Sequence, residues 1–206
     1  MKNLPFNYID ILVVILLAVG IFRGRKRGMS EELLTFIQWI VIVFGGAQIY
    51  EPLGKMLSQV APFSLMTCYI AVYVSFAILI KLFFSQIKRA VGEKLVGSNF
   101  FGDSEYYLGM LAGMLRFACV VLMTMAIINA RLITDYERAQ TARMQSKNFE
   151  GISFPTFGSI QQAVLYESIS GKFVKDYLNF TLIRSTVPQD VAISRSKNDP
   201  ADLTDK

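Results

Sequence analysis

The sequence contains no histidine and only two cysteines among its 206 residues. Without histidine, the chain cannot build a Ser-His-Asp triad, a histidine general base or a histidine metal site. Cys68 and Cys119 each lie in an apolar stretch and have no CxxC partner. Two such residues cannot form a zinc site, so we expect them to pack as apolar side chains rather than form a disulfide. These absences predict no metal and no cofactor.

Charged residues are scarce as well, at 18% of the chain, whereas hydrophobic residues make up 53%. A soluble domain typically has about a quarter of its residues charged. The apolar residues form long blocks instead of short alternations, and four blocks are long enough to cross a bilayer as helices. They cover approximately residues 4–22, 33–50, 63–84 and 107–128. We therefore predict an all-α membrane protein whose residues 1–130 form a domain with four transmembrane helices.

The remaining segments are more polar. Residues 85–102 carry apolar side chains at near-helical spacing between lysines, arginine and glutamate, which predicts an interfacial amphipathic helix before the fourth span. Residues 131–186 are expected to form an amphipathic helical tail, broken near Gly171. Residues 187–206 are rich in acids, amides and proline, and we expect this C-terminus to be disordered.

A basic cluster, Arg23-Gly24-Arg25-Lys26-Arg27, directly follows the first apolar block. It borders a predicted membrane span and contains no aromatic residues, so the positive-inside rule explains it better than nucleic-acid binding does. Lys88, Arg89 and Lys94 follow the third block. This distribution predicts a membrane protein with cytoplasmic basic loops and with both termini outside. Contact with anionic lipid headgroups is expected, and a nucleic-acid partner is not.

The fourth apolar block contains Gly109, Gly113 and Arg116. Two glycines four residues apart share one face of a helix and leave it nearly flat, so that another helix can approach closely. The face could serve simple packing within the chain or form a seam between subunits. A charge at the depth of Arg116 costs about 3 kcal/mol on insertion scales, so its side chain must face protein or water and not lipid.

Three other polar residues within the predicted spans are candidate partners for Arg116, namely Asp10, Gln38 and Tyr73. With a rise of about 1.5 Å per residue, Gln38 and Tyr73 lie at depths that suit an arginine leaning toward the cytoplasmic end. Asp10 lies about 10 Å further away. We therefore expect Tyr73 or Gln38 to contact Arg116 in preference to Asp10, which has either an interfacial position or a buried functional role.

These residues occur in an order that resembles the colicin V production protein family of bacterial inner-membrane proteins. The shared positions are Ile9-Asp10, Arg23-Gly24, Glu31 or Glu32, Trp39, Glu105, Leu108-Gly109, Gly113 and Arg116. The resemblance covers roughly residues 6–130 and is weaker around Glu167-Ser168. The sequence departs from the family pattern at two positions. The family usually has aspartate at the position of Glu105 and glycine at the position of Phe117.

The resemblance implies a role in production or export of the toxin colicin V, or in envelope homeostasis. One reading is a non-enzymatic membrane protein that acts as a homo-oligomer in the lipid bilayer, with envelope or secretion proteins as partners. The alternative is a small oligomeric transporter or channel that uses the intramembrane polar residues Asp10, Gln38, Tyr73 and Arg116. A membrane enzyme without histidine would need clustered carboxylates or a serine–lysine pair. The sequence shows no acids clustered at one depth, so we expect no enzymatic activity.

Overall fold

The computed structural model describes residues 7–96, 102–133, 137, 139–141, 143–144 and 155–186. This part of the chain is helical, without a strand. The helices are α1 (Tyr8–Ile40), η1 (Val41–Gly45), α2 (Gly46–Val60), α3 (Leu65–Val96), η2 (Gly102–Ser104), α4 (Glu105–Asn129), α6 (Phe157–Gln162), η3 (Ala163–Glu167), α7 (Ile169–Tyr177) and η4 (Asn179–Thr181). The expected disorder of residues 187–206 concerns a segment outside the described residues.

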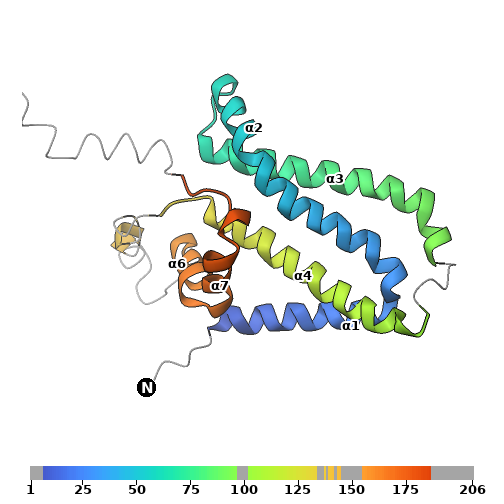
Figure 1. Cartoon of the computed structure of the whole chain (residues 1–206). Coiled ribbons are helices and arrows are strands. Elements are labelled where there is room, and N and C mark those ends of the chain that lie inside the picture. Colours follow the sequence, from blue (N-terminus) through green and yellow to red (C-terminus); the bar gives the residue numbers. More distant parts are fainter. Residues whose placement is uncertain are drawn as a thin grey trace, which may run out of the picture.

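Helix α1 consists of two arms that meet at Gly28, where φ is 74° and ψ is 171°. Glycine adopts this positive φ without the steric penalty that other residues incur. The first arm covers residues 8–27, and the second arm covers residues 29–40 and continues through the π-helical turn η1 into α2 (Figure 1). The basic cluster is therefore the helical end of the first arm, and the turn itself is a single glycine.

Helix α4 lies between the two arms of α1, and α3 packs along the second arm and α2 (Figure 1). Two of the described helices contain a stretch long and apolar enough to cross a membrane, Leu65–Val91 in α3 and Glu105–Asn129, which is α4. The first two predicted spans are less distinct by this measure. Charged residues border the apolar part of the first arm, and the second span is divided among α1, η1 and α2.

The separate interfacial helix predicted for residues 85–102 is not present as such. Residues 85–96 continue α3 without a break, because no proline or helix-ending turn interrupts the helix-forming residues after Phe84. The 32 residues of α3 span about 48 Å, which exceeds the roughly 30 Å of a bilayer's hydrocarbon core. The polar end of α3 therefore extends the helix beyond its apolar part. Similarly, α2 continues to Val60 and includes Pro52.

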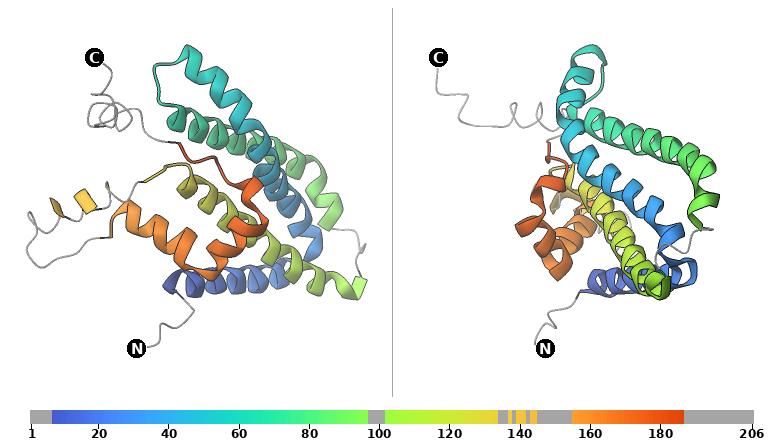
Figure 2. Two further views of the ribbon diagram at one scale, coloured as in Figure 1. Left: turned by 60° about the vertical axis from the view of Figure 1, so that its left-hand side comes forward. Right: turned by 45° about the vertical axis from the view of Figure 1, so that its right-hand side comes forward.

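The tail, defined here as residues 155–186, folds against one end of the helical bundle (Figure 2). Gln161 donates hydrogen bonds to the carbonyl oxygens of Ile128 (2.9 Å) and Arg131 (2.6 Å), at the end of α4. The break between its helices lies at Ser168, three residues before Gly171, near which the sequence predicted it. A β-carbon at Gly171 would lie 2.8 Å from the Cα atom of Leu165, so glycine allows α7 to pack against η3.

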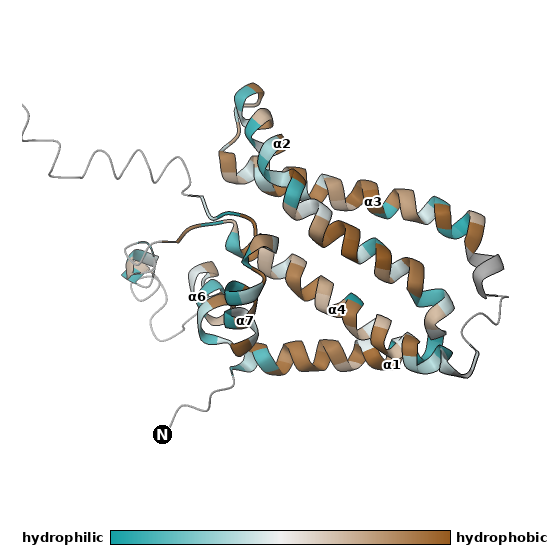
Figure 3. Ribbon diagram, in the orientation of Figure 1, coloured by the Kyte–Doolittle hydropathy of each residue, from teal (hydrophilic) through white to brown (hydrophobic). Residues whose placement is uncertain are grey.

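Apolar residues dominate the middle of the long helices, and hydrophilic residues gather at the two ends of the bundle (Figure 3). One end contains the Gly28 turn, the basic cluster and Lys88 near the end of α3. The other end contains the start of α1, the end of α4 and the tail (Figure 1). We refer to these as the basic end and the tail end.

Candidate functional site: a buried charge cluster beside a glycine seam

The two glycines of α4 pack directly against glycines of the first arm. A β-carbon at Gly109 would lie 2.6 Å from the carbonyl oxygen of Gly24 and 2.7 Å from the carbonyl carbon of Gly28. A β-carbon at Gly20 would lie 2.7 Å from the carbonyl oxygen of Gly113. These are contacts with backbone, which cannot move aside as a flexible side chain can. The flat face of α4 is thus filled by the first arm of the same chain, and we call this contact the glycine seam.

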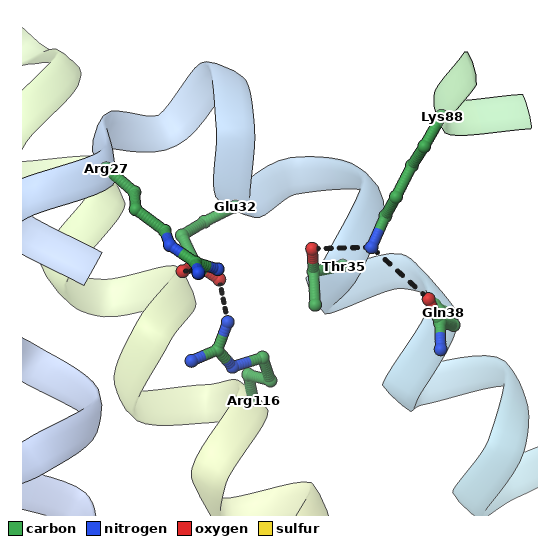
Figure 4. A network of polar contacts seen from close by, with 6 residues as sticks. All are labelled: Arg27, Glu32, Thr35, Gln38, Lys88 and Arg116. Atoms are coloured by element: carbon green, nitrogen blue, oxygen red, sulfur yellow. Dashed lines mark hydrogen bonds and ion pairs between the residues drawn. The ribbon is translucent and has the colours of Figure 1, made fainter. Parts of the chain in front are cut away.

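The seam holds α4 close to both arms of α1, and Arg116 lies one turn beyond it, facing the second arm. Its guanidinium contacts the carboxylate of Glu32, with Nη1 2.5 Å from Oε2 (Figure 4). Arg116 is 6% exposed and Glu32 is fully buried. The ion pair therefore joins two helices inside the bundle, where water does not screen the charges.

Two further cations surround the ion pair (Figure 4). Arg27 lies 3.5 Å from the second carboxylate oxygen of Glu32, and its side chain is 39% exposed at the basic end. Lys88 of α3 donates to the hydroxyl of Thr35 (2.9 Å) and to the amide oxygen of Gln38 (3.4 Å). We call these six residues the charge cluster: Arg27, Glu32, Thr35, Gln38, Lys88 and Arg116. Its three cations face one carboxylate, so the cluster carries an excess of positive charge.

The partner of Arg116 differs from the sequence-based expectation. Gln38 belongs to the charge cluster, but it contacts Lys88 and not Arg116. The hydroxyl of Tyr73 is buried without a hydrogen-bond partner among the described residues. The ring of Tyr73 packs against Gly46, where a β-carbon would lie 2.7 Å from it. Tyr73 therefore fills the space between α2 and α3 and forms no hydrogen bond with Arg116.

Asp10 lies at the tail end, where it holds the N-terminus of α7. Its carboxylate accepts hydrogen bonds from the backbone amides of Ile169 (3.1 Å) and Ser170 (2.9 Å) and from the Ser170 hydroxyl (2.7 Å). Ser168 caps the same helix by accepting from the amide of Gly171 (2.9 Å). A carboxylate at this position satisfies free amide groups and interacts favourably with the helix dipole. Asp10 thus fastens the tail to the first arm.

A second, exposed contact links the tail to α2. The Arg184 guanidinium lies 3.0 Å from a carboxylate oxygen of Glu51, which also accepts a 2.8 Å hydrogen bond from Lys55. The hydrogen bond from Lys55 is the main reason why the pKa of Glu51 is lowered from its ordinary value. Nearby, the amide of Arg184 donates to the hydroxyl of Tyr50 (3.0 Å). The tail is therefore attached to α2 as well as to α1 and α4.

The other sequence-based candidates lie near the glycine seam and the Gly28 turn. Gly24 is part of the glycine seam, and Glu105 lies at the turn, where a β-carbon on Gly28 would be 2.8 Å from its Oε1 atom. Arg23 and Glu31 are exposed. Glu32, the neighbour of Glu31, is the acid that enters the cluster. The three-residue spacing of Glu32, Thr35 and Gln38 is the sequence signal by which this polar helix face could have been found.

A sequence model of the colicin V production protein family matches residues 9–169, which is more than half of the chain. The chain belongs to the colicin V production protein family. The match extends the expected resemblance beyond residue 130 and includes the charge cluster, the glycine seam, Asp10 and Ile169. Comparisons with curated proteins and with solved structures found no significant match. Membership of the colicin V production family and the apolar helices α3 and α4 together indicate a membrane protein.

Proposed function

We propose that the chain crosses the bacterial inner membrane four times, through the first arm, the second arm with η1 and α2 as far as Tyr50, α3 and α4. Support comes from the apolar side chains that the bundle leaves exposed over much of its length. Examples are Ile11, Val14 and Ile15 on the first arm and Leu79 and Leu82 on α3. Monomeric soluble proteins rarely expose contiguous apolar surface of this extent, whereas lipid-facing helices require it.

We further propose that the basic end faces the cytoplasm and that the tail and both termini lie outside. The exposed residues Arg23, Arg25 and Lys26 gather at the basic end, as the positive-inside rule requires of the cytoplasmic side. Cysteine labelling from outside the cell tests this topology. A cysteine at Tyr177 on α7 is expected to react with a membrane-impermeant maleimide, whereas one at Lys26 is not. The opposite pattern would reverse the topology.

The function that we propose is non-enzymatic support of colicin V production or secretion, or of envelope homeostasis, with lipid and envelope or secretion proteins as partners. The observation that carries this proposal is the Glu32–Arg116 ion pair. Charged residues at membrane depth are costly and mark sites that matter for function or assembly. The pair joins α1 to α4 and reaches the basic end through Arg27. A partner at the cytoplasmic surface can therefore act on the packing of the bundle at this cluster.

The experiment that tests this proposal measures toxin activity in the culture supernatant and inside the cells. Cells that lack their own copy of this protein and carry the colicin V genes receive the wild type, Glu32→Gln, Arg116→Gln or the double variant. We expect both single variants to reduce release at equal membrane levels, whereas Arg184→Gln, in an exposed ion pair, does not. Normal release of toxin activity by both single variants would exclude the charge cluster as the functional site.

The second candidate function is a small transporter or channel. The excess positive charge of the cluster favours it, and so does the buried hydroxyl of Tyr73, which has no hydrogen-bond partner in the described part of the chain. Both are compatible with a polar path between helices. Anion flux into vesicles that contain the purified chain, lost on Arg116→Ala, would support this function over the first. Absence of flux from the wild type in vesicles with confirmed insertion would exclude it.

Self-association stays part of the proposal, but it must use a surface other than the glycine seam. The face of Gly109 and Gly113 is covered by the first arm of the same chain. Gly113→Leu is therefore expected to destabilise each chain without changing the number of chains in the oligomer, as measured by light scattering in detergent and by mass photometry in nanodiscs. A change from oligomer to folded monomer would place the seam between subunits.

A further inference from the structure

A groove with a volume of about 700 Å³ lies between the first arm and α4 at the basic end. Its lining consists of Phe22, Arg25, Lys26, Tyr106, Tyr107 and Met110. The glycine seam explains why the groove forms there. Because the backbones of Gly24 and Gly109 touch, the larger side chains beside them on each helix must point outward, and they form the two walls.

The lining combines two cations with three aromatic rings. Arg25 and Lys26 are exposed, and Phe22, Tyr106 and Tyr107 are exposed to 68%, 62% and 73%. Among the residues that the structure describes, none of those lining the groove is acidic. The nearest acid in sequence, Glu105, has its carboxylate at the Gly28 turn instead. The groove is therefore a positively charged, aromatic-walled site that is open at the surface.

We propose that this groove binds the headgroup of an anionic phospholipid. The inference rests on the proposed membrane insertion and identifies a lipid partner that insertion alone does not require. Basic residues attract anionic lipids of the cytoplasmic leaflet, and tyrosine rings are enriched at the level of the headgroups. An arginine offers paired donors to a phosphate, and a lysine adds a compact charge beside it. Tyr106 and Tyr107 add hydroxyl groups that can donate to phosphate or glycerol oxygens.

A continuous apolar stripe leads away from the groove along the first arm. Phe22, Val19, Ile15 and Leu12 follow one another at three- and four-residue spacing, and all four are exposed. Ten residues of helix extend about 15 Å, which is half the thickness of a bilayer's hydrocarbon core and thus suits one lipid acyl chain. An acidic peptide or a soluble phosphorylated compound would not use this stripe. The combination of a cationic groove and an apolar stripe therefore favours a phospholipid.

Native mass spectrometry of the purified full chain tests the proposal, with phosphatidylglycerol and phosphatidylcholine of identical acyl chains added in equal amounts to the detergent. The wild type is expected to retain phosphatidylglycerol preferentially. Arg25→Gln/Lys26→Gln should weaken this retention on the order of tenfold, because each cation near an anionic surface contributes appreciably to binding. The matched control is Lys81→Gln/Arg89→Gln, which removes the same charge from exposed positions on α3 and should retain the preference.

Equal retention by the groove variant and the wild type, or equal losses in the groove variant and the control, would overturn the inference. Displacement of phosphatidylglycerol by millimolar inorganic phosphate would assign the groove to a free anion instead. Tyr107→Ser changes no charge and should also weaken retention, so it provides a second test if the double variant does not fold.

Alkaline carbonate extraction distinguishes the lipid-site proposal from the proposal of membrane insertion. Release of the wild type from membranes would contradict insertion itself. A chain that stays in the membrane but binds phosphatidylglycerol independently of Arg25 and Lys26 contradicts only the lipid site.

Discussion

Glu32→Gln leaves the buried guanidinium of Arg116 without the carboxylate that it contacts. Removing one partner of a buried ion pair typically destabilises a protein by about 3–5 kcal/mol, because the remaining charge is neither solvated nor neutralised. Here the remaining charge is 6% exposed, and Arg27 is a second cation on the same side. We therefore expect the cost of Glu32→Gln to lie toward the upper end of this range.

Arg116→Gln should be less damaging, because Glu32 keeps Arg27 at 3.5 Å and Lys88 in the same cluster. The partly exposed side chain of Arg27 can adjust toward the carboxylate. We expect a loss of about 3 kcal/mol. In the double variant, two neutral amides face each other, and the cations that remain, Arg27 and Lys88, are partly exposed and not fully buried. Its cost should be at least about 2 kcal/mol below the sum of the two single costs.

Unfolding in mixed micelles with increasing SDS measures the free energy of each variant relative to the wild type. Arg184→Gln serves as the control, since exposed ion pairs contribute little. Additive costs, with a coupling below about 0.5 kcal/mol, would show that Glu32 and Arg116 do not act as a buried pair. Rescue of Arg116→Gln by Asp10→Asn would contradict the positions of these residues at different ends of the bundle.

Three further outcomes are expected. Gly113→Ala should lower the free energy of unfolding by about 1–3 kcal/mol, because the new β-carbon would meet backbone atoms of the first arm. The control Gly45→Ala should cost less, because the atom nearest to its β-carbon is the end of the Phe76 ring, 3.0 Å away. Asp10→Asn weakens the charge-assisted hydrogen bonds that hold α7, so limited proteolysis of the tail should become faster. The control Asp176→Asn, on the exposed face of α7, should leave the proteolysis rate unchanged. Because the pKa of Glu51 is lowered, its ionised contact with Arg184 persists at neutral pH and is lost only as the pH falls through that lowered pKa; an NMR titration in which Glu51 showed its ordinary carboxylate pKa would contradict this.

The glycine spacing in α4 predicted a close helix contact because that signal is local: two residues four apart define one face of one helix. The partner helix was not predictable in the same way, since Gly20 and Gly24 belong to a segment about 90 residues away. The first arm was expected to end before Arg23, with a turn up to Gly28. It stays helical through Arg27, which brings Glu32 into the bundle beside α4 and not to its surface.

Long-range contacts explain the remaining differences. Asp10 binds the amides of Ile169 and Ser170, a partnership across about 160 residues that no helical periodicity encodes. The depth comparison considered only polar residues inside the predicted spans. Glu32 lies one residue before the second predicted span, residues 33–50, so it was not a candidate partner for Arg116. The continuation of the first arm through Arg27 and the turn at Gly28 place Glu32 inside the bundle, and this arrangement depends on tertiary packing that a count of residues does not capture.

The single-residue turn at Gly28 has a consequence for biogenesis. In the proposed four-span arrangement, a single glycine leaves no loop that would let the two arms lie far apart at the membrane. We therefore expect the first and second arms to insert together as a helical hairpin, with the arginine-rich bend on the cytoplasmic side.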